Sequence, residues 1–410
     1  MRKAAWVLLL LFVFSIPWEY SLDLGEPYGN IARILGLVTL FVAIPAAIQA
    51  GGVRTPSALQ ILTLALFLWL CATCFWTVEP ELTEQKLRGF AQEMMIVWLV
   101  WEFVESPRDL YLILRAWLLG SGVLAALTIA NLPSPGALSE GQIRFAPIGQ
   151  DPNDVARFLD LGFPIAALLF DRESRWPGRL LALGFFPLGI AAVLLTASRG
   201  GFLAALAALS GSVFLLMRRH HRVALPLLLA VPLLVLGIWF FIPPDTLARL
   251  NTIPDQLQGG DLNQRLNIWE AGGRAFLEAP FFGHGAGSFV SAAGLAPADT
   301  AHNTALAILV ESGVIGFILA CAILLAAVHA ALQERAALRA ALITLLLTWT
   351  VSSLVGTVAE NRTTWLLFGV IACAARFAKA ESAPAHAEFS FTVDAVSSSP
   401  APARALRTSR

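Results

Sequence analysis

The chain has 410 residues, of which 57% are hydrophobic and only 14% are charged, and its mean hydropathy is +0.71. This composition excludes an ordinary soluble domain and indicates a membrane protein. The formal net charge is zero, so the composition does not suggest a nucleic-acid partner.

Apolar runs separated by short charged turns follow one another along the chain. A hydrocarbon layer about 30 Å thick is crossed by roughly 20 apolar residues in a helix, so the sequence predicts an all-α polytopic membrane protein with about 12 transmembrane helices. The first apolar run has no small-x-small cleavage site after it, so we expect an uncleaved span rather than a signal peptide. The expected spans are roughly 4–18, 30–50, 58–77, 90–104, 110–131, 154–171, 178–196, 201–217, 223–243, 304–330, 338–358 and 363–378.

The basic residues gather on one side of these spans. With the N-terminus inside, the cytoplasmic connections hold most of the Lys and Arg residues, as the positive-inside rule requires, and an even number of spans returns the C-terminus to the cytoplasm. The basic residues on that side are Arg2, Lys3, Arg54, Arg108, Arg172, Arg175, Arg179, Arg218, Arg219, Arg222, Arg335, Arg339, Arg376 and Lys379. The opposite short loops hold Lys86, Arg88, Arg144, Arg199 and Arg362, with Arg33 near a boundary.

One connection is much longer than the others. Residues 244–302 lie on the outer side, between spans one to nine (1–243) and spans ten to twelve (303–378), and loops of this length usually carry function. Within the loop, Leu262–Leu277 has helical periodicity, and the glycine-rich stretch 283–287 ends it. The tail 379–410 is rich in Ala, Ser and Pro, and we expect it to be disordered.

Arg199 lies in the turn Ser198-Arg199-Gly200, which is so short that two spans must meet there. An arginine at the membrane boundary is costly unless it has an acidic partner or an anionic ligand. The alternative is an interfacial arginine whose guanidinium reaches up to water.

Arg265 and Trp269 stand one helical turn apart in the long loop. A guanidinium beside an indole suits a phosphate next to a sugar ring, and two arginines form a natural clamp for a pyrophosphate. The alternative is a solvent-exposed arginine over a packing tryptophan.

His302 and Asn303 stand at the junction of this loop with the tenth span, on the same side as Arg199 and Arg265. A neutral imidazole there could accept the proton of a sugar hydroxyl. The alternative is a histidine at a helix start that bonds only to backbone.

Three further polar groups could line the same vestibule. Glu311 lies inside the tenth span, where a carboxylate must be neutral or paired, and it could equally be a structural contact. Arg362 lies in the last outer turn. The segment Gln150–Asp154 reads more simply as a turn and a helix cap, with Asp151 or Asn153 as the cap.

Nothing in the sequence indicates a cofactor. The outer face has no DxD motif and no cluster of His, Cys or carboxylates with ligand spacing, so we expect a metal-independent mechanism. The glycine stretch 283–287 follows no strand and is not a nucleotide fingerprint.

Five short pieces, in this order, resemble the superfamily of O-antigen ligases and O-antigen polymerases, which are membrane glycosyltransferases. They are Ser198-Arg199-Gly200, Arg265-x-x-x-Trp269, the stretch from Pro280 to Phe289, Ala301-His302-Asn303, and Glu311-Ser312-Gly313-Val314-Ile315-Gly316. The resemblance, which covers most of residues 30–378, implies a GT-C-like fold in the bacterial inner membrane with its active site at the periplasmic face.

The resemblance also implies a chemistry. The donor would be a glycan linked to undecaprenyl pyrophosphate, transferred with inversion of the anomeric centre and without nucleotide sugar or metal. Arg199 and Arg265 match the family's pyrophosphate-binding arginines, and His302 matches its essential histidine. Trp269, Asn303, Glu311 and Arg362 are possible accessory residues.

The acceptor is less clear from the sequence. We favour an O-antigen ligase, which passes the glycan to the lipid A core oligosaccharide in lipopolysaccharide biosynthesis. A polymerase of O-antigen or exopolysaccharide, or a related oligosaccharyltransferase, is the first alternative. A transporter or flippase of anionic lipids is an alternative of another class, although most spans are free of the charged residues that a transport path requires.

Overall fold

The computed structural model describes residues 1–25, 28–131, 138–139, 142–239, 242, 244–253, 264–297 and 299–382. These residues form one bundle of helices with a single two-residue hairpin, β1 (Leu138–Ser139) and β2 (Gln142–Ile143), which pair antiparallel. The predicted all-α polytopic membrane fold is therefore confirmed. Only the first four residues of the predicted disordered tail 379–410 lie among the described residues, and they continue the last helix.

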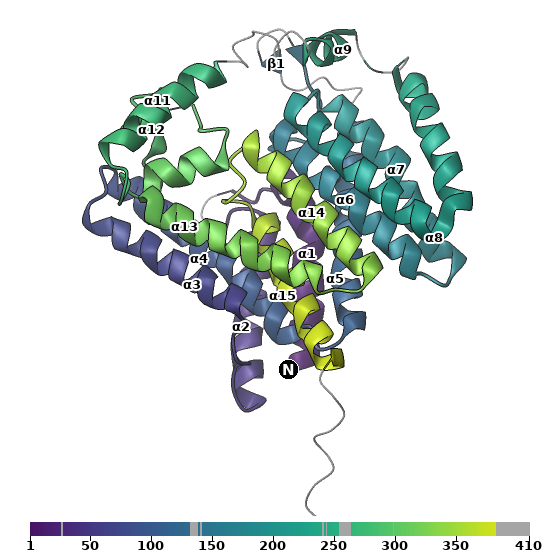
Figure 1. The fold of residues 1–410 in the computed structure, drawn as a ribbon, viewed down its shortest axis with the longest axis horizontal. Helices are drawn as coiled ribbons and strands as arrows, with labels where there is room; N and C mark the ends of the chain where they lie inside the picture. The colour runs from purple at the N-terminus through teal and green to yellow at the C-terminus, as the bar shows by residue number, and fades with distance from the viewer. Residues whose placement is uncertain are drawn as a thin grey trace, which may run out of the picture.

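The bundle is built from long helices joined by short turns (Figure 1). In chain order they are α1 (Arg2–Ser15), the 3-10 helix η1 (Ile16–Ser21), α2 (Ile31–Gln49), α3 (Ala58–Ala72), η2 (Thr73–Phe75), α4 (Pro80–Phe103), α5 (Pro107–Ala130), α6 (Pro152–Arg172), α7 (Trp176–Leu195), α8 (Arg199–Trp239), α9 (Pro244–Asn251), α11 (Arg265–Glu278), α12 (Phe289–Ala292), α13 (Thr304–Leu332), α14 (Ala336–Leu354) and α15 (Arg362–Ser382).

Local sequence explains where several of these helices start. Proline occupies the first helical position of α4, α5 and α6, where its missing N–H costs nothing. Ser106 and Asp109 form a capping box at the start of α5, and the side chains of Asn30 and Asp151 cap α2 and α6.

Nine of the described helices are long and apolar enough to cross a membrane. Two expected spans, 90–104 and 154–171, correspond to α4 and α6, which are helical but carry charged side chains. Residues 223–239 of the expected span 223–243 form the second half of α8, after a kink at His220, and residues 240, 241 and 243 lie outside the described residues. In α6, residues from Leu159 to Phe170 are all buried, so this helix is surrounded by its neighbours.

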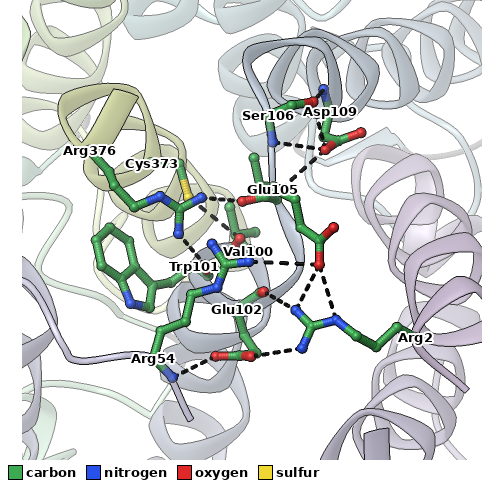
Figure 2. Close-up of polar contacts among 11 residues, drawn as sticks. Arg2, Arg54, Val100, Trp101, Glu102, Glu105, Ser106, Asp109, Cys373 and Arg376 are labelled. Carbon is green, nitrogen blue, oxygen red and sulfur yellow. Dashed lines mark hydrogen bonds and ion pairs between the residues drawn. The ribbon is translucent and has the colours of Figure 1, made fainter. Parts of the chain in front are cut away.

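One end of the bundle holds the N-terminus and the end of α15, and α9, α11 and α12 lie along the opposite edge (Figure 1). At the terminal end, Glu102 accepts hydrogen bonds from the Arg2 guanidinium at 3.4 Å and from the backbone N–H of Arg54 at 2.9 Å. Arg376 donates to the carbonyl of Trp101 at 2.9 Å. Figure 2 shows that these contacts gather α1, the α2–α3 connection and α15 around the last turn of α4.

Helix α13 is broken inside its length. Gly313 has φ 65° and ψ −170°, so residues 304–312 form a half-helix that ends there. The glycine-rich loop fills the break: the backbone N–H groups of His284 and Gly285 donate to the carbonyls of Val310 and Glu311, each at 2.9 Å. The two sequence pieces from Pro280 to Phe289 and from Glu311 to Gly316 are therefore one interlocked unit.

The first half of α13 also carries a small separate core. Ile268 and Ala275 of α11, Phe289 of α12, and Ala307 and Val310 of α13 are buried against one another. The predicted loop helix at 262–277 is observed as α11, and this core holds it against α13.

Candidate functional site

Arg199 is the first residue of α8 and follows the turn Thr196–Ser198, in which Ala197 has φ 49°. Its guanidinium is half-buried and donates to the carbonyl of Arg249 at 3.2 Å and to the hydroxyl of Thr252. Arg249 in turn donates to the carbonyl of Ala197 at 3.2 Å. The side chain thus turns toward the short helix α9 rather than reaching freely into water.

Arg265 is the first residue of α11, directly after Gln264 with φ 62°. Burial lowers the pKa of Arg265, the positive charge of Arg199 lowers it further, and the carboxylate of Asp151 raises it. Two guanidiniums from distant parts of the chain therefore lie within each other's electrostatic field. Such a pair of cations favours an anionic ligand.

His302 precedes α13, and its own backbone has φ 45°. The indole N–H of Trp269 donates to the carbonyl of Ala301 at 2.9 Å, which fixes the backbone next to the imidazole. Burial lowers the pKa of His302, and the charges of Arg265 and Arg157 lower it further. The imidazole is therefore neutral near pH 7 and can accept a proton.

The three predicted residues share an uncommon backbone feature. Ala197, Gln264 and His302 are the non-glycine residues with positive φ in the part of the chain that the structure describes. Ala197 lies two residues before Arg199, Gln264 directly precedes Arg265, and His302 is itself a candidate residue. Left-handed backbone in residues other than glycine costs roughly 1–2 kcal/mol and is concentrated at functional sites.

Two further arginines, Arg144 and Arg157, lie near Arg199 and Arg265, and we call these four residues the arginine cluster. Arg144 donates to the carbonyl of Thr196 at 3.1 Å and to the side-chain oxygen of Asn153 at 2.8 Å. Burial lowers the pKa of Arg144, Asp151 raises it, and Arg265 and Arg199 lower it. Arg157 of α6 forms an ion pair with Asp154, and its charge acts on His302.

These residues were not chosen from the sequence, although signals for them existed. Arg144 was one of few basic residues on the predicted outer side, and Arg157 is an arginine inside an expected span, which usually marks function. Asp151 caps α6 by accepting from the N–H of Asn153 at 2.7 Å, as the turn interpretation predicted. Its carboxylate also acts on Arg265 and His302, so it is the acidic member of the cluster.

Trp269 and Asn303 hold the site in shape. The Trp269 indole N–H bonds to backbone, as described above, and Asn303 caps α13 by accepting from the N–H of Leu306 at 3.0 Å. The amide of Asn303 donates to the carbonyl of Leu354 at 3.3 Å, joining α13 to the end of α14. Both side chains therefore position His302.

Glu311 and Arg362 are not in the arginine cluster but face a separate cavity. Lys86 lies between two carboxylates, with its Nζ 2.5 Å from Oε2 of Glu311 and 2.6 Å from Oε1 of Glu360. Arg362 is paired with Glu19. The expectation that Glu311 is either paired or neutral is met by the ion pair with Lys86.

The cavity has a volume of about 1010 Å³ and lies between α2, α4, α12, α13 and α15. Its wall includes Asp299, Thr300 and Ala301, the residues that lead directly to His302. Its charged lining residues are Arg33, Lys86, Arg88, Arg362, Glu93, Asp299, Glu311 and Glu360.

A metal site was not expected, and no group of three His, Cys, Asp or Glu side chains suited to a metal occurs within the described ranges. The expectation of a metal-independent mechanism stays a prediction.

Comparison with protein families matches residues 184–321, about a third of the chain, to the family described as O-Antigen ligase. The matched region contains Arg199, Arg265, His302 and both halves of the interlocked unit, so the resemblance seen in the sequence is confirmed. Arg144, Arg157 and Arg362 lie outside it.

Comparison with curated proteins gave no match. One similar solved chain comes from a structure described as "Structural coordination of polymerization and crosslinking by a peptidoglycan synthase complex". It has 16% sequence identity and a TM-score of 0.44, and the match covers 78% of this chain and 97% of that chain. At this TM-score the likeness supports no conclusion.

Proposed function

We propose that this multi-pass membrane protein is an O-antigen ligase, which transfers glycan from undecaprenyl pyrophosphate to the lipid A core oligosaccharide. The match of residues 184–321 to the O-antigen ligase family supports this proposal. The reaction takes place at the periplasmic face of the bacterial inner membrane, and both termini are cytoplasmic. The observation that carries the proposal is that Arg199 begins α8, Arg265 begins α11 and His302 directly precedes the cap of α13, while the charge of Arg199 lowers the pKa of Arg265 and the charge of Arg265 lowers that of His302.

The arginines stabilise the negative charge of the leaving group. A pyrophosphate carries several negative charges, and guanidinium groups donate paired, charge-assisted hydrogen bonds to such oxygens. Arg199 and Arg265 lie at two helix starts, and Arg144 adds a third positive charge beside them. Stabilising charge that builds up on the leaving group is usually the largest contribution to this kind of catalysis.

His302 activates the acceptor hydroxyl as a general base. The acceptor hydroxyl oxygen attacks the anomeric carbon from the side opposite the pyrophosphate, and a new C–O bond forms while the bond from that carbon to the phosphate oxygen breaks. The neutral imidazole takes the hydroxyl proton, and undecaprenyl pyrophosphate leaves with the bonding electron pair. The histidinium then releases its proton to water.

The test is reconstitution of the purified protein with undecaprenyl-pyrophosphate-linked glycan and lipid A core. We expect Arg199→Ala, Arg265→Ala and His302→Ala each to lower transfer by at least about a hundredfold, because each removes either a proposed ligand of the pyrophosphate leaving group or the proposed base. Arg274→Ala is the matched control, since this arginine is also on α11 but exposed and paired with Glu270. Full activity of the His302 variant would refute the mechanism.

The same assay separates the alternatives. Elongation of a second undecaprenyl-linked glycan, with no transfer to lipid A core, would identify a polymerase. Buried ion pairs such as Lys86–Glu311 beside a broken helix are also found in transporters. Movement of lipid-linked glycan across vesicles that survives His302→Ala would favour that class.

A further inference from the structure

The large cavity beside His302 is distinct from the arginine cluster in its charge. Four basic and four acidic side chains line it, so its walls are close to neutral overall. The arginine cluster, by contrast, has a clear excess of positive charge. A pyrophosphate fits the cluster, whereas a polyhydroxyl group without net charge fits the cavity better.

One wall of the cavity contains a buried acid, one oxygen of which lacks a hydrogen-bond partner among the described residues. Glu93 of α4 is 8% exposed, and its Oε2 has no hydrogen-bond partner among the residues that the structure describes. The charges of Arg362, Glu360 and Glu19 act on this carboxyl group, and the indole of Trp365 lies beside it. A buried polar atom without a partner is costly, so a ligand that donates a hydrogen bond would be stabilised there.

Helix α4 presents this acid on a continuous polar face. Lys86, Gly89 and Glu93 follow one another at intervals of three and four residues, so they lie on the same side of the helix, and all three line the cavity. Phe90 and Tyr20 add aromatic surface to the lining. Carboxylates, amides and aromatic faces together are the groups that bind sugar rings.

We propose that this cavity binds the acceptor: its sugar ring, neutral or bearing an amino group, donates a hydroxyl or amine hydrogen bond to Glu93. This inference rests on the proposed transferase function. The lining residues Asp299, Thr300 and Ala301 directly precede His302 in the chain, so an acceptor seated here lies next to the segment that carries the base.

Two variants test the cavity in different ways. Glu93→Gln keeps the shape and replaces one acceptor oxygen of the carboxyl group with an amide NH2 donor. Gly89→Phe fills the cavity, because a Cβ built at Gly89 meets no atom within 4 Å and the helix tolerates a side chain there. The matched controls are Glu81→Gln in the exposed first turn of α4 and Gly184→Phe, an exposed and equally open position on α7.

The measurement is initial transfer rate with varied lipid A core and varied undecaprenyl-pyrophosphate glycan. Loss of one hydrogen bond to a buried acceptor corresponds to roughly a tenfold change in binding, so we expect both variants to raise the acceptor KM about tenfold or more. The donor KM should stay unchanged, and both controls should behave as the unmodified protein does.

Three results would overturn the inference. An unchanged acceptor KM in Gly89→Phe refutes it even if Glu93→Gln fails to accumulate. A rise in the donor KM alone would assign the cavity to the donor. Absence of transfer by the unmodified protein would refute the proposed function and this inference together, whereas the first two results leave the function standing.

Discussion

The protonation of the His302 imidazole depends on its burial and on nearby charges of both signs. Burial lowers the pKa of His302, the charges of Arg265 and Arg157 lower it further, and those of Asp151 and Asp299 raise it. Because the proposed base must be neutral, transfer should be fully active above this lowered pKa and should be lost as the pH falls through it.

Two single substitutions should shift, in opposite directions, the pH below which transfer is lost, which is the acidic limb of the pH profile. Asp299→Asn removes a negative charge, so the pKa of His302 falls further and the limb moves to lower pH. Arg157→Gln removes a positive charge, so the pKa rises and the limb moves to higher pH. The measurement is the pH dependence of kcat/KM. Shifts in the same direction would show that another group titrates.

At this scale the sequence suggested the proposed reacting groups but not their surroundings. Arg199, Arg265 and His302 could be chosen because they stand at short turns and loop ends. Arg157 could not be assigned from the sequence, because an apolar run predicts a span without saying which face of it lines a site. Only packing shows that α6 is surrounded and that its arginine acts on His302.

At the scale of elements, the break in α13 depends on one glycine. A Cβ built at Gly313 would lie 2.2 Å from the backbone oxygen of Phe281, and the left-handed φ is itself unfavourable for other residues. Gly313→Ala should therefore destabilise the protein by about 3 kcal/mol or more. We expect a lower thermal unfolding midpoint in detergent.

Gly184→Ala serves as the control for this change, since it lies in a helix with open space around it and alanine favours helix. Its unfolding midpoint should be equal or higher. If Gly313→Ala unfolded at the same temperature as the unmodified protein, the interlocked unit would contribute little to stability.

The sequence predicted each half of this unit separately. The glycine stretch was expected to end α11, and Glu311 was expected to be paired or neutral. Neither expectation predicts that the two segments contact each other. The contact of Gly285 with Glu311 joins two turns that hydropathy treats as a loop and a continuous span. Hydropathy also does not show whether a helix continues through a charged stretch. The kink at His220 was therefore predicted as a cytoplasmic turn between two spans.

At the scale of the whole molecule, the contacts around Glu102 hold the terminal end together. Its side chain is 1% exposed and accepts from Arg2 and from the N–H of Arg54. Glu102→Ala leaves these donors without their buried acceptor, which should cost about 1–3 kcal/mol of folding free energy. The thermal midpoint should fall, while both KM values stay unchanged because the site is at the other end. A changed acceptor KM would contradict this separation.

The general architecture was readable because membrane spans are long and apolar, and their charged connections indicate how they alternate. The nine apolar helices were predicted for this reason. The cavity was not, because its lining comes from η1, α2, α4, α13 and α15, which only tertiary packing brings together.

The half-helix 304–312 also fixes the spacing between His302 and the glycine-rich loop. His302 stands before its first turn, and the glycine-rich loop is fastened to its last carbonyls. Inserting or deleting one residue between them would rotate the imidazole by roughly 100° around the helix axis. The number of residues from His302 to Gly313 is therefore fixed by geometry, even where the identities of the side chains between them can vary.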